Sequence, residues 1–134
     1  MQYQGTLEAE TVYYEAVSSL DLFPTSLGLA GIDGEQEYDG VDLMPHLLGQ
    51  SEGSPHEELF WRVGDRAALR RWDWKIVRER KRGGPGPWLL FNLAANLSEE
   101  NNLADTEKGK LEELVETWEE HDGEMVEPVF KIFL

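Results

Sequence analysis

Cysteine is absent from this 134-residue sequence. The chain therefore forms no disulfide, binds no metal through thiolates and uses no Cys nucleophile. Long apolar runs are missing too, because none reaches the roughly 18 residues that a membrane-spanning helix needs. The N-terminus lacks the basic, apolar and small-residue pattern of a signal peptide. We therefore expect neither export nor membrane insertion from this sequence, although a longer parent chain could carry a signal of its own.

Basic residues are missing from the first part of the chain, since residues 1–61 contain twelve acidic residues and no Lys or Arg. The formal net charge of the whole sequence is −15. Phosphates would be repelled by such a chain, so we do not expect general nucleic-acid binding. Nine of the twelve basic residues gather in residues 62–82. This basic stretch has the charge of an anion-binding patch, but we favour ion pairs with the chain's own acidic ends.

The length and the apolar content, which is 40% and includes five Trp and five Phe, suit one folded domain. Near the N-terminus, Val12, Tyr13 and Tyr14 predict a short strand. A helix over Glu8–Ala16 is the alternative.

The next segment, Ser19–Ala30, has the apolar spacing of a helix. Asp21 can cap its N-terminus, and Pro24 falls in the first turn, where a missing N–H costs nothing. Gly31 is a suitable residue for its C-terminal end.

The middle of the chain is rich in turn residues. Asp33–Asp42 is predicted to be a loop, and Leu43–Leu48 a short helical turn. Gly49–Pro55 is polar and made of small residues, so it is the best internal boundary. We therefore divide the chain into residues 1–50 and residues 51–134.

The second part begins with a series of short strands. Glu58–Val63, Arg66–Arg71, Trp74–Arg80 and Trp88–Leu93 have strand character. The links between the first three are tight, which favours antiparallel pairing, because parallel strands need long crossovers. Lys81–Pro87 is rich in Gly and Pro and is predicted to loop out of the sheet.

A long helix is predicted over Asp105–His121, with Asp105 or Thr106 as its cap. Its apolar residues recur at helical spacing and form one stripe that must pack on the sheet; they are Leu111, Leu114, Val115 and Trp118. The tail Val126–Leu134 is apolar enough for a further extended segment. The expected fold class is α+β: an antiparallel sheet of about four strands against a C-terminal helix, preceded by a short N-terminal strand and helix.

Five segments resemble consecutive stretches of one enzyme family, in the same order and at the same spacing. They are Ser18–Ile32 (the pattern Asp-Leu-x-Pro-Thr and Leu-Ala-Gly-Ile), Asp39–Gly49 (Asp-Gly, then Leu-x-Pro), His56–Arg62, Ala68–Val77 (Arg-x-x-Asp-Trp-Lys) and Leu90–Leu93 with Glu99–Ala104 (Asn-Leu-Ala). On these motifs, residues 15–120 resemble the C-terminal part of a sulfatase of the alkaline-phosphatase-like superfamily.

The resemblance implies that residues 1–50 correspond to the end of the large α/β domain and residues 51–134 to the C-terminal subdomain. Two departures stand out. Trp72 replaces a family glycine in a hairpin, where a positive φ would be costly for a bulky side chain, so we expect a rebuilt turn. Asn92 replaces a family Asp.

The resemblance also implies where the chemistry resides. Sulfatases use a Cys-x-Pro-Ser-Arg signature, whose Cys becomes formylglycine, and a calcium ion held by Asp and Asn oxygens. Both belong to the large domain, so we predict no catalytic residue, metal ligand or cofactor in this chain. His46, His56 and His121 lie in separate segments, and we interpret them as surface or packing residues.

Four residues are candidates for lining a substrate cleft, because aromatic rings stack on sugars and Arg binds anionic groups: His56, Trp61, Arg62 and Arg66. We favour a structural interpretation, in which Trp61 belongs to the core and the Arg side chains form cross-strand pairs. Asp21 and Asp73 are interpreted as a helix cap and a turn residue.

The predicted function is therefore that of a sulfatase-like C-terminal module, inactive alone and derived from a sulfuric ester hydrolase. The alternative is a stand-alone binding or assembly protein that reuses the module. Its surface, once packed on the catalytic domain, would then be exposed and would favour self-association. The expected partners are accordingly a missing catalytic half or a second copy in a homodimer.

Overall fold

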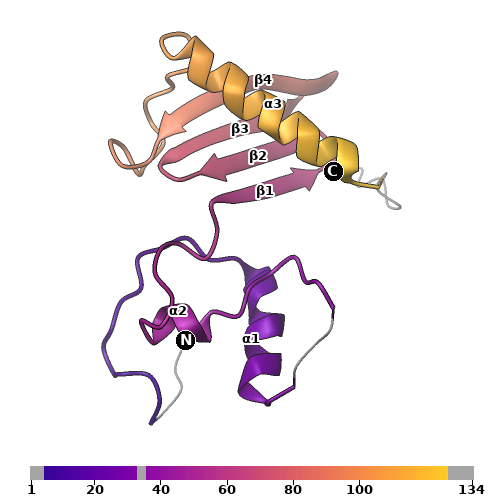
Figure 1. Cartoon of the computed structure of the whole chain (residues 1–134). Coiled ribbons are helices and arrows are strands. Elements are labelled where there is room, and N and C mark those ends of the chain that lie inside the picture. Colours follow the sequence, from indigo (N-terminus) through magenta and orange to yellow (C-terminus); the bar gives the residue numbers. More distant parts are fainter. Residues whose placement is uncertain (1–4, 33–35, 127–134) are drawn as a thin grey trace. The chain divides into compact units, whose positions relative to one another are not determined.

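The computed structural model describes residues 5–32 and 36–126. It divides into two compact units, Met1–Glu57 and Glu58–Leu134 (Figure 1). The predicted boundary after residue 50 falls within the turn-rich end of the first unit. No helix in the described parts is both long and apolar enough to cross a membrane.

The helices of the first unit are short. A 3-10 turn, η1 (Ser19–Asp21), leads directly into α1 (Leu22–Leu29), and α2 (Met44–Leu47) follows the loop. These elements confirm the predicted helices. Ser18 and Asp21 form a reciprocal capping box at the start of η1.

The end of α1 is a Schellman motif, as the position of Gly31 predicts. Gly31 adopts a φ of 66°, and its N–H donates to Gly28 O at 3.1 Å. Ile32 N donates to Leu27 O at 3.0 Å, which satisfies a second terminal carbonyl.

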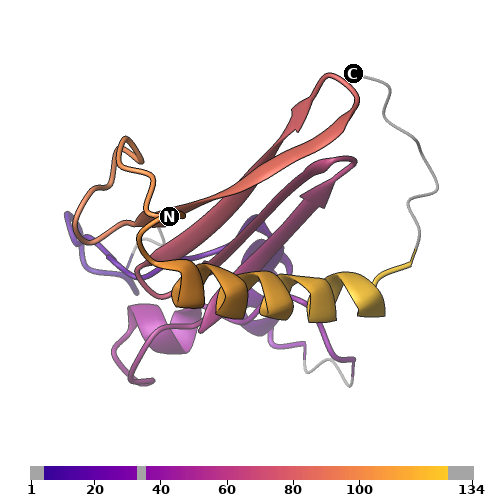
Figure 2. The same cartoon turned by 90° about the horizontal axis from the view of Figure 1, so that it is seen from above.

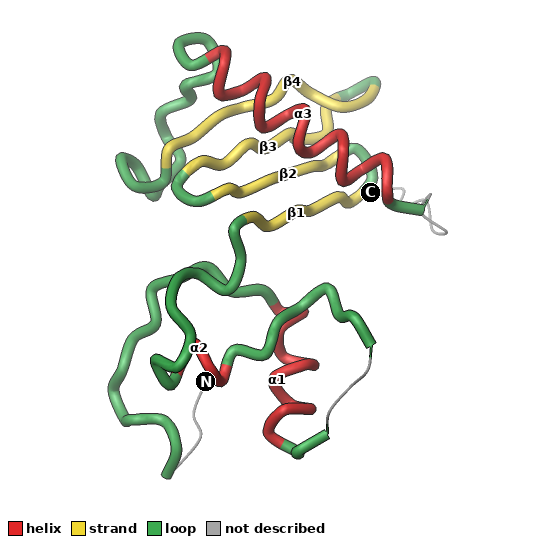
Figure 3. Tube along the Cα trace, in the orientation of Figure 1, coloured by secondary structure: helices red, strands yellow, loops and turns green. Residues whose placement is uncertain are grey.

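The predicted strand at Val12–Tyr14 is wrong. Residues 11–14 have no regular secondary structure, and the alternative helix over Glu8–Ala16 is not formed either (Figure 3). A strand exists only when its backbone pairs with another strand. The described residues of the first unit contain no strand to which this segment could bond.

The second unit is an antiparallel meander with the spatial order β1-β2-β3-β4. The strands are β1 (Glu58–Val63), β2 (Arg66–Arg71), β3 (Trp74–Lys81) and β4 (Gly84–Asn92). Helix α3 (Lys108–Glu124) crosses one face of this sheet (Figures 1 and 2). The predicted α+β fold class is confirmed.

The Lys81–Pro87 segment is not the predicted loop. Lys81 pairs with Gly84 and Arg80 pairs with Pro85, so the two strands continue almost to the turn. Gly83, at a φ of 103°, makes this tight reversal possible. The two prolines are accepted here because β4 is an edge strand and its register with β3 shifts between Arg78 and Arg80.

The turn at Trp72 is not rebuilt. Trp72 takes a φ of 54°, and Arg71 still pairs with Trp74 across a two-residue link. The Trp72 side chain is 54% exposed, so the ring meets no packing conflict. The positive φ that a glycine favours is thus retained by a bulky residue at some cost in strain.

The core of the second unit lies between the sheet and α3. Its buried members are Ala67, Leu69, Ile76, Leu90, Leu114 and Trp118. The other two residues of the predicted helical stripe, Leu111 and Val115, pack against this core. The predicted caps are wrong: Glu107 holds the N-cap position without a side-chain bond, and Thr106 Oγ1 donates to Leu103 O instead. Residues 127–134 of the predicted C-terminal segment lie outside the described residues.

Candidate functional site

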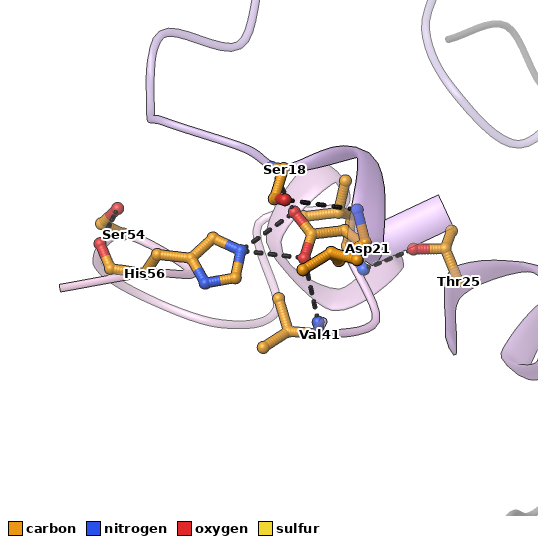
Figure 4. Close-up of polar contacts among 8 residues, drawn as sticks. Ser18, Asp21, Thr25, Val41, Ser54 and His56 are labelled. Carbon is orange, nitrogen blue, oxygen red and sulfur yellow. Dashed lines mark hydrogen bonds and ion pairs between the residues drawn. The ribbon is translucent and has the colours of Figure 1, made fainter. Parts of the chain in front are cut away.

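A buried carboxylate organises the first unit. Asp21 is 0% exposed, and its Oδ2 accepts from Ser18 N at 2.6 Å while its Oδ1 accepts from Val41 N at 3.0 Å. His56 Nε2 lies 2.8 Å from Oδ1 and 2.9 Å from Oδ2 (Figure 4). Asp21 therefore joins three segments of the unit: the start of η1, the loop before α2, and the residues after position 53.

The charged state of Asp21 depends on a balance. Burial raises the pKa of this carboxyl, but the bonds from Ser18, His56 and Val41 outweigh burial and hold the pKa below its ordinary value. The His56 side chain is only 10% exposed. The result is a largely buried Asp–His pair in which the carboxylate is ionised.

Small residues allow the segments to approach Asp21 closely. A Cβ at Gly40 would overlap the Leu20 carbonyl and would lie 2.7 Å from Asp21 N. Within α1, the buried Thr25 Oγ1 accepts from Leu43 N at 3.0 Å. The Asp-Gly dipeptide at residues 39 and 40, interpreted as turn chemistry, thus has a second role in packing.

The Asp21–His56 pair supplies the Asp and the His of a Ser-His-Asp arrangement, but no Ser is bonded to the imidazole ring of this His among the described residues. Ser54 Oγ donates to the backbone O of His56 at 2.9 Å (Figure 4). The Ser54 hydroxyl is therefore not bonded to the imidazole ring of His56. A serine nucleophile needs a hydrogen bond to such a base for its activation. The described residues also contain no group of three or more His, Asp or Glu side chains that could hold a metal ion.

The four candidate cleft residues are divided between the two units. His56 belongs to the first unit, where it bonds to Asp21; sequence reasoning, which treated it as a lone histidine, missed this contact. Arg62 lies on β1 and bonds to Asp122 Oδ1 at 2.6 Å, a contact with α3 instead of the predicted cross-strand pair. Arg66 does form a cross-strand pair, with Glu79 at 3.5 Å.

Trp61 is not a core residue, in contrast to the favoured interpretation. It follows Phe60 along β1, so the two side chains point to opposite faces of the sheet. Phe60 stacks on Trp118 on the helix side, at a ring distance of 5.5 Å. Trp61 points away from the helix and is 45% exposed.

A second charged cluster, also missed from the sequence, joins β1 to β2 and α3. Glu58 accepts from His121 Nε2 at 2.6 Å and from Arg71 Nε at 2.9 Å. Burial raises the pKa of Glu58, but these two partners together hold it below its ordinary value. Arg71 also lies 3.5 Å from Glu113 on α3. The cluster fixes the helix on the edge of the sheet.

The basic stretch is largely occupied by the chain's own acids. Besides the pairs already described, Lys75 bonds to Glu99 at 2.6 Å, and Arg80 lies 3.6 Å from Asp65. Arg78 instead stacks over Trp88, with its guanidinium carbon 4.6 Å from the ring centre.

The sequence and the structure of the chain were compared with those of known proteins. No protein-family profile matches the sequence. An uncharacterized sulfatase of Schizosaccharomyces pombe is 25% identical over 134 residues, a match that covers 92% of this chain and 24% of the relative. The steryl-sulfatase of Mus musculus is 34% identical over 89 residues, which cover 65% of this chain and 13% of the relative. The crystal structure of Ps i-CgsB superposes with a TM-score of 0.71 at 27% identity, over 89% of this chain and 27% of that one.

The chain resembles a C-terminal sulfatase fragment. This sulfatase-like module spans about a quarter or less of the curated relatives that it matches. The match to Ps i-CgsB includes both units of the module, because it extends over 89% of the chain. The sulfatase resemblance predicted from the five motifs is therefore confirmed.

Proposed function

We propose that this chain is a sulfatase-derived module that hydrolyses no sulfate ester alone and acts only together with the remainder of a sulfatase. The observation that carries the proposal is the coverage: nearly the whole chain matches about a quarter of a sulfatase. A catalytic centre would then reside in the remaining three quarters.

The residues of the chain support this proposal. The sequence contains no Cys from which formylglycine could be made. In the first unit, the ionised Asp21 is saturated by three internal partners, and Ser54 is bonded to a backbone carbonyl. We place the formylglycine and the calcium of the resembled family in the portion that this chain does not cover.

An activity assay tests the proposal. The purified chain is incubated with an aryl sulfate ester, with and without calcium, and the expected turnover equals that of buffer. Turnover that survives repurification and follows the protein peak would show that the chain carries its own catalytic centre.

Among the candidate cleft residues, Trp61 is the best suited to contact substrate. Its ring is exposed, whereas His56, Arg62 and Arg66 have carboxylate partners. Ps i-CgsB, which is 29% identical in this comparison, was solved in complex with k-i-k-neocarrahexaose, and aromatic rings suit sugar faces. In the assembled enzyme, Trp61→Ala should raise KM and leave kcat nearly unchanged; an unchanged KM would exclude this role.

The second candidate function is a self-associating assembly protein. It is favoured by the apolar side chains that the first unit leaves in water, such as Leu22 at 55% and Phe23 at 59% exposure. Light scattering at micromolar concentrations decides the matter, because a homodimer doubles the measured mass and a monomer does not.

A further inference from the structure

Among the described residues of the first unit, the backbone of Thr11–Val17 finds no hydrogen-bond partner. Among the described residues, none of its seven N–H and C=O pairs makes a hydrogen bond, and only the Thr11 side chain does, to Glu8 O at 3.0 Å. Five of these seven residues are exposed, so their backbone groups are accessible to an incoming strand. The segment also contains the strand-forming residues Val12, Tyr13 and Tyr14. It is a strand by composition that lacks a neighbouring strand.

An apolar groove lies beside this segment and has a volume of about 1100 Å3. Its apolar lining consists of Leu7, Val12, Val17, Leu22, Leu43 and Leu47. Leu43 is buried at 5% exposure, whereas Val12, Val17 and Leu22 are 66%, 48% and 55% exposed. Side chains of this size in water favour burial against another apolar surface.

Tyr13, a residue that lines the groove, also has a polar group without a partner among the described residues. Tyr13 Oη is buried and bonds to no described residue. Burial, and then the charge of Glu15, raise the pKa of Tyr13, so the hydroxyl stays protonated and can donate. A buried donor without an acceptor costs free energy, so the packing around Tyr13 is incomplete in the chain alone.

The charge of the first unit restricts what can occupy the groove. Residues 1–57 contain eleven acidic residues and no Lys or Arg, and Glu8 and Glu10 line the groove itself. A second copy of this unit would bring carboxylates against carboxylates. The surface instead suits an apolar segment flanked by Lys or Arg.

We propose that Thr11–Val17 is a strand-addition site, which pairs with an extended segment of the sulfatase portion that this chain does not cover. This inference rests on the proposed function and names the surface through which the module joins its catalytic portion. The uncovered portion amounts to about three quarters of the relatives' length. Strand addition supplies the missing backbone bonds, and alternate side chains of the new strand enter the groove.

The experiment uses the 134-residue chain and the uncovered sulfatase portion encoded in the same genome, produced as a separate polypeptide. We expect a 1:1 complex that weakens as salt is raised. In the complex, the amides of residues 11–17 should exchange with deuterium more slowly than in the free chain. Val12→Pro removes a backbone donor and should weaken binding about tenfold or more, while the melting temperature of the free chain stays unchanged.

Two matched controls accompany these measurements. Glu37→Pro alters another exposed residue of the same unit whose backbone makes no bond to described residues, and it should bind like the wild type. Leu22→Glu, in the groove, should weaken binding, whereas Leu97→Glu, at 80% exposure in the second unit, should not.

Three outcomes would overturn the inference: a genome without such a sulfatase portion, no complex at micromolar concentrations, or a complex in which residues 11–17 exchange as fast as before. A complex unaffected by Val12→Pro would also contradict it. The aryl sulfate assay is independent of these results, so a failure here leaves the proposed inactivity of the isolated chain as it was.

Discussion

The two units of this chain are stabilised by different means. In the second unit, the largest fully buried side chains are apolar: Leu69, Ile76, Leu90 and Leu114. In the first unit they are polar, Thr25 and Asp21. The second unit thus encloses a core of its own between sheet and helix. The first unit is held by hydrogen bonds to one carboxylate and leaves much of its apolar surface in water, as expected of one layer of a larger domain.

The largest effect is expected from the core of the second unit. Leu114→Ala should lower its free energy of unfolding by about 2–5 kcal/mol, because it leaves a cavity at a site with 0% exposure. Chemical denaturation followed by Trp fluorescence measures this loss. The control Leu97→Ala, at an 80% exposed position, should change stability by about 0.5 kcal/mol or less. Loss of the His56 NMR signal together with the Trp signal would show that the two units unfold as one.

A matched pair of glycines tests the close packing of the first unit. A Cβ at Gly40 meets backbone of Leu20 and Asp21, which cannot move aside, so Gly40→Ala should cost about 1–3 kcal/mol. A Cβ at Gly28 meets only the side-chain carboxyl group of Asp42, and alanine favours the helix. Gly28→Ala should therefore stay within about 1 kcal/mol of the wild type by thermal denaturation. Equal losses of stability in both variants would contradict the close packing of Gly40 against Leu20 and Asp21.

Acid should weaken both units through their bonded carboxylates, since Asp21 and Glu58 have lowered pKa values. The unfolded chain takes up its proton at a higher pH than the folded one. The stabilisation is therefore complete above the ordinary values of 3.8 for Asp and 4.5 for Glu, and it is lost as the pH falls through the lowered values.

Neutral variants measure these contributions separately. Asp21→Asn should cost the first unit about 1–3 kcal/mol at neutral pH and flatten its loss of stability in acid. Glu58→Gln should do the same, less strongly, in the second unit, because that side chain is 26% exposed. Denaturation at a series of pH values compares the units. The NMR signal of His56 reports on the first unit, and Trp fluorescence reports on the second. An unchanged pH dependence in Asp21→Asn would assign the acid sensitivity to other groups.

The smallest effect is expected at the hairpin between β2 and β3. Trp72→Gly removes the strain of a left-handed conformation, which costs about 1–2 kcal/mol at a bulky residue. Glycine, however, loses more conformational entropy on folding, which costs about 0.5–1 kcal/mol. A net stabilisation of about 0–1.5 kcal/mol should result. The comparison is Gly64, at a φ of 58° between β1 and β2, where Gly64→Ala should destabilise. Destabilisation by Trp72→Gly would indicate that the Trp72 ring contributes packing.

The fold of the second unit was largely predictable, because its signals are local and periodic. The stripe of Leu111, Leu114, Val115 and Trp118 identifies α3, and the bounds of β1 and β2 agree with the predicted strands. The Lys81–Pro87 prediction failed because the preferences of Gly and Pro do not reveal that a strand lies at an edge. At Val12–Tyr14, strand-forming residues were present, but pairing depends on a partner that local sequence does not specify.

The Asp21–His56 pair could not be predicted in this way. The two residues are 35 positions apart, and neither belongs to a periodic pattern. A polar contact between distant segments depends on how they are packed, and sequence spacing carries no trace of it. The same holds for Glu58 and His121, which are 63 positions apart. The substrate role of His56, Trp61, Arg62 and Arg66 stays a prediction for the assembled enzyme.

The prolines of β4 have a consequence for the behaviour of this chain in concentrated solution. Pro85 and Pro87 have no N–H to donate in this edge strand, and the Leu90 N–H farther along is taken by Asn102 Oδ1 at 3.0 Å. Growth of the sheet into a fibril by edge-to-edge stacking needs a continuous row of donors on both sides. The β4 edge interrupts that row, so pairing of further strands is disfavoured on this side of the sheet.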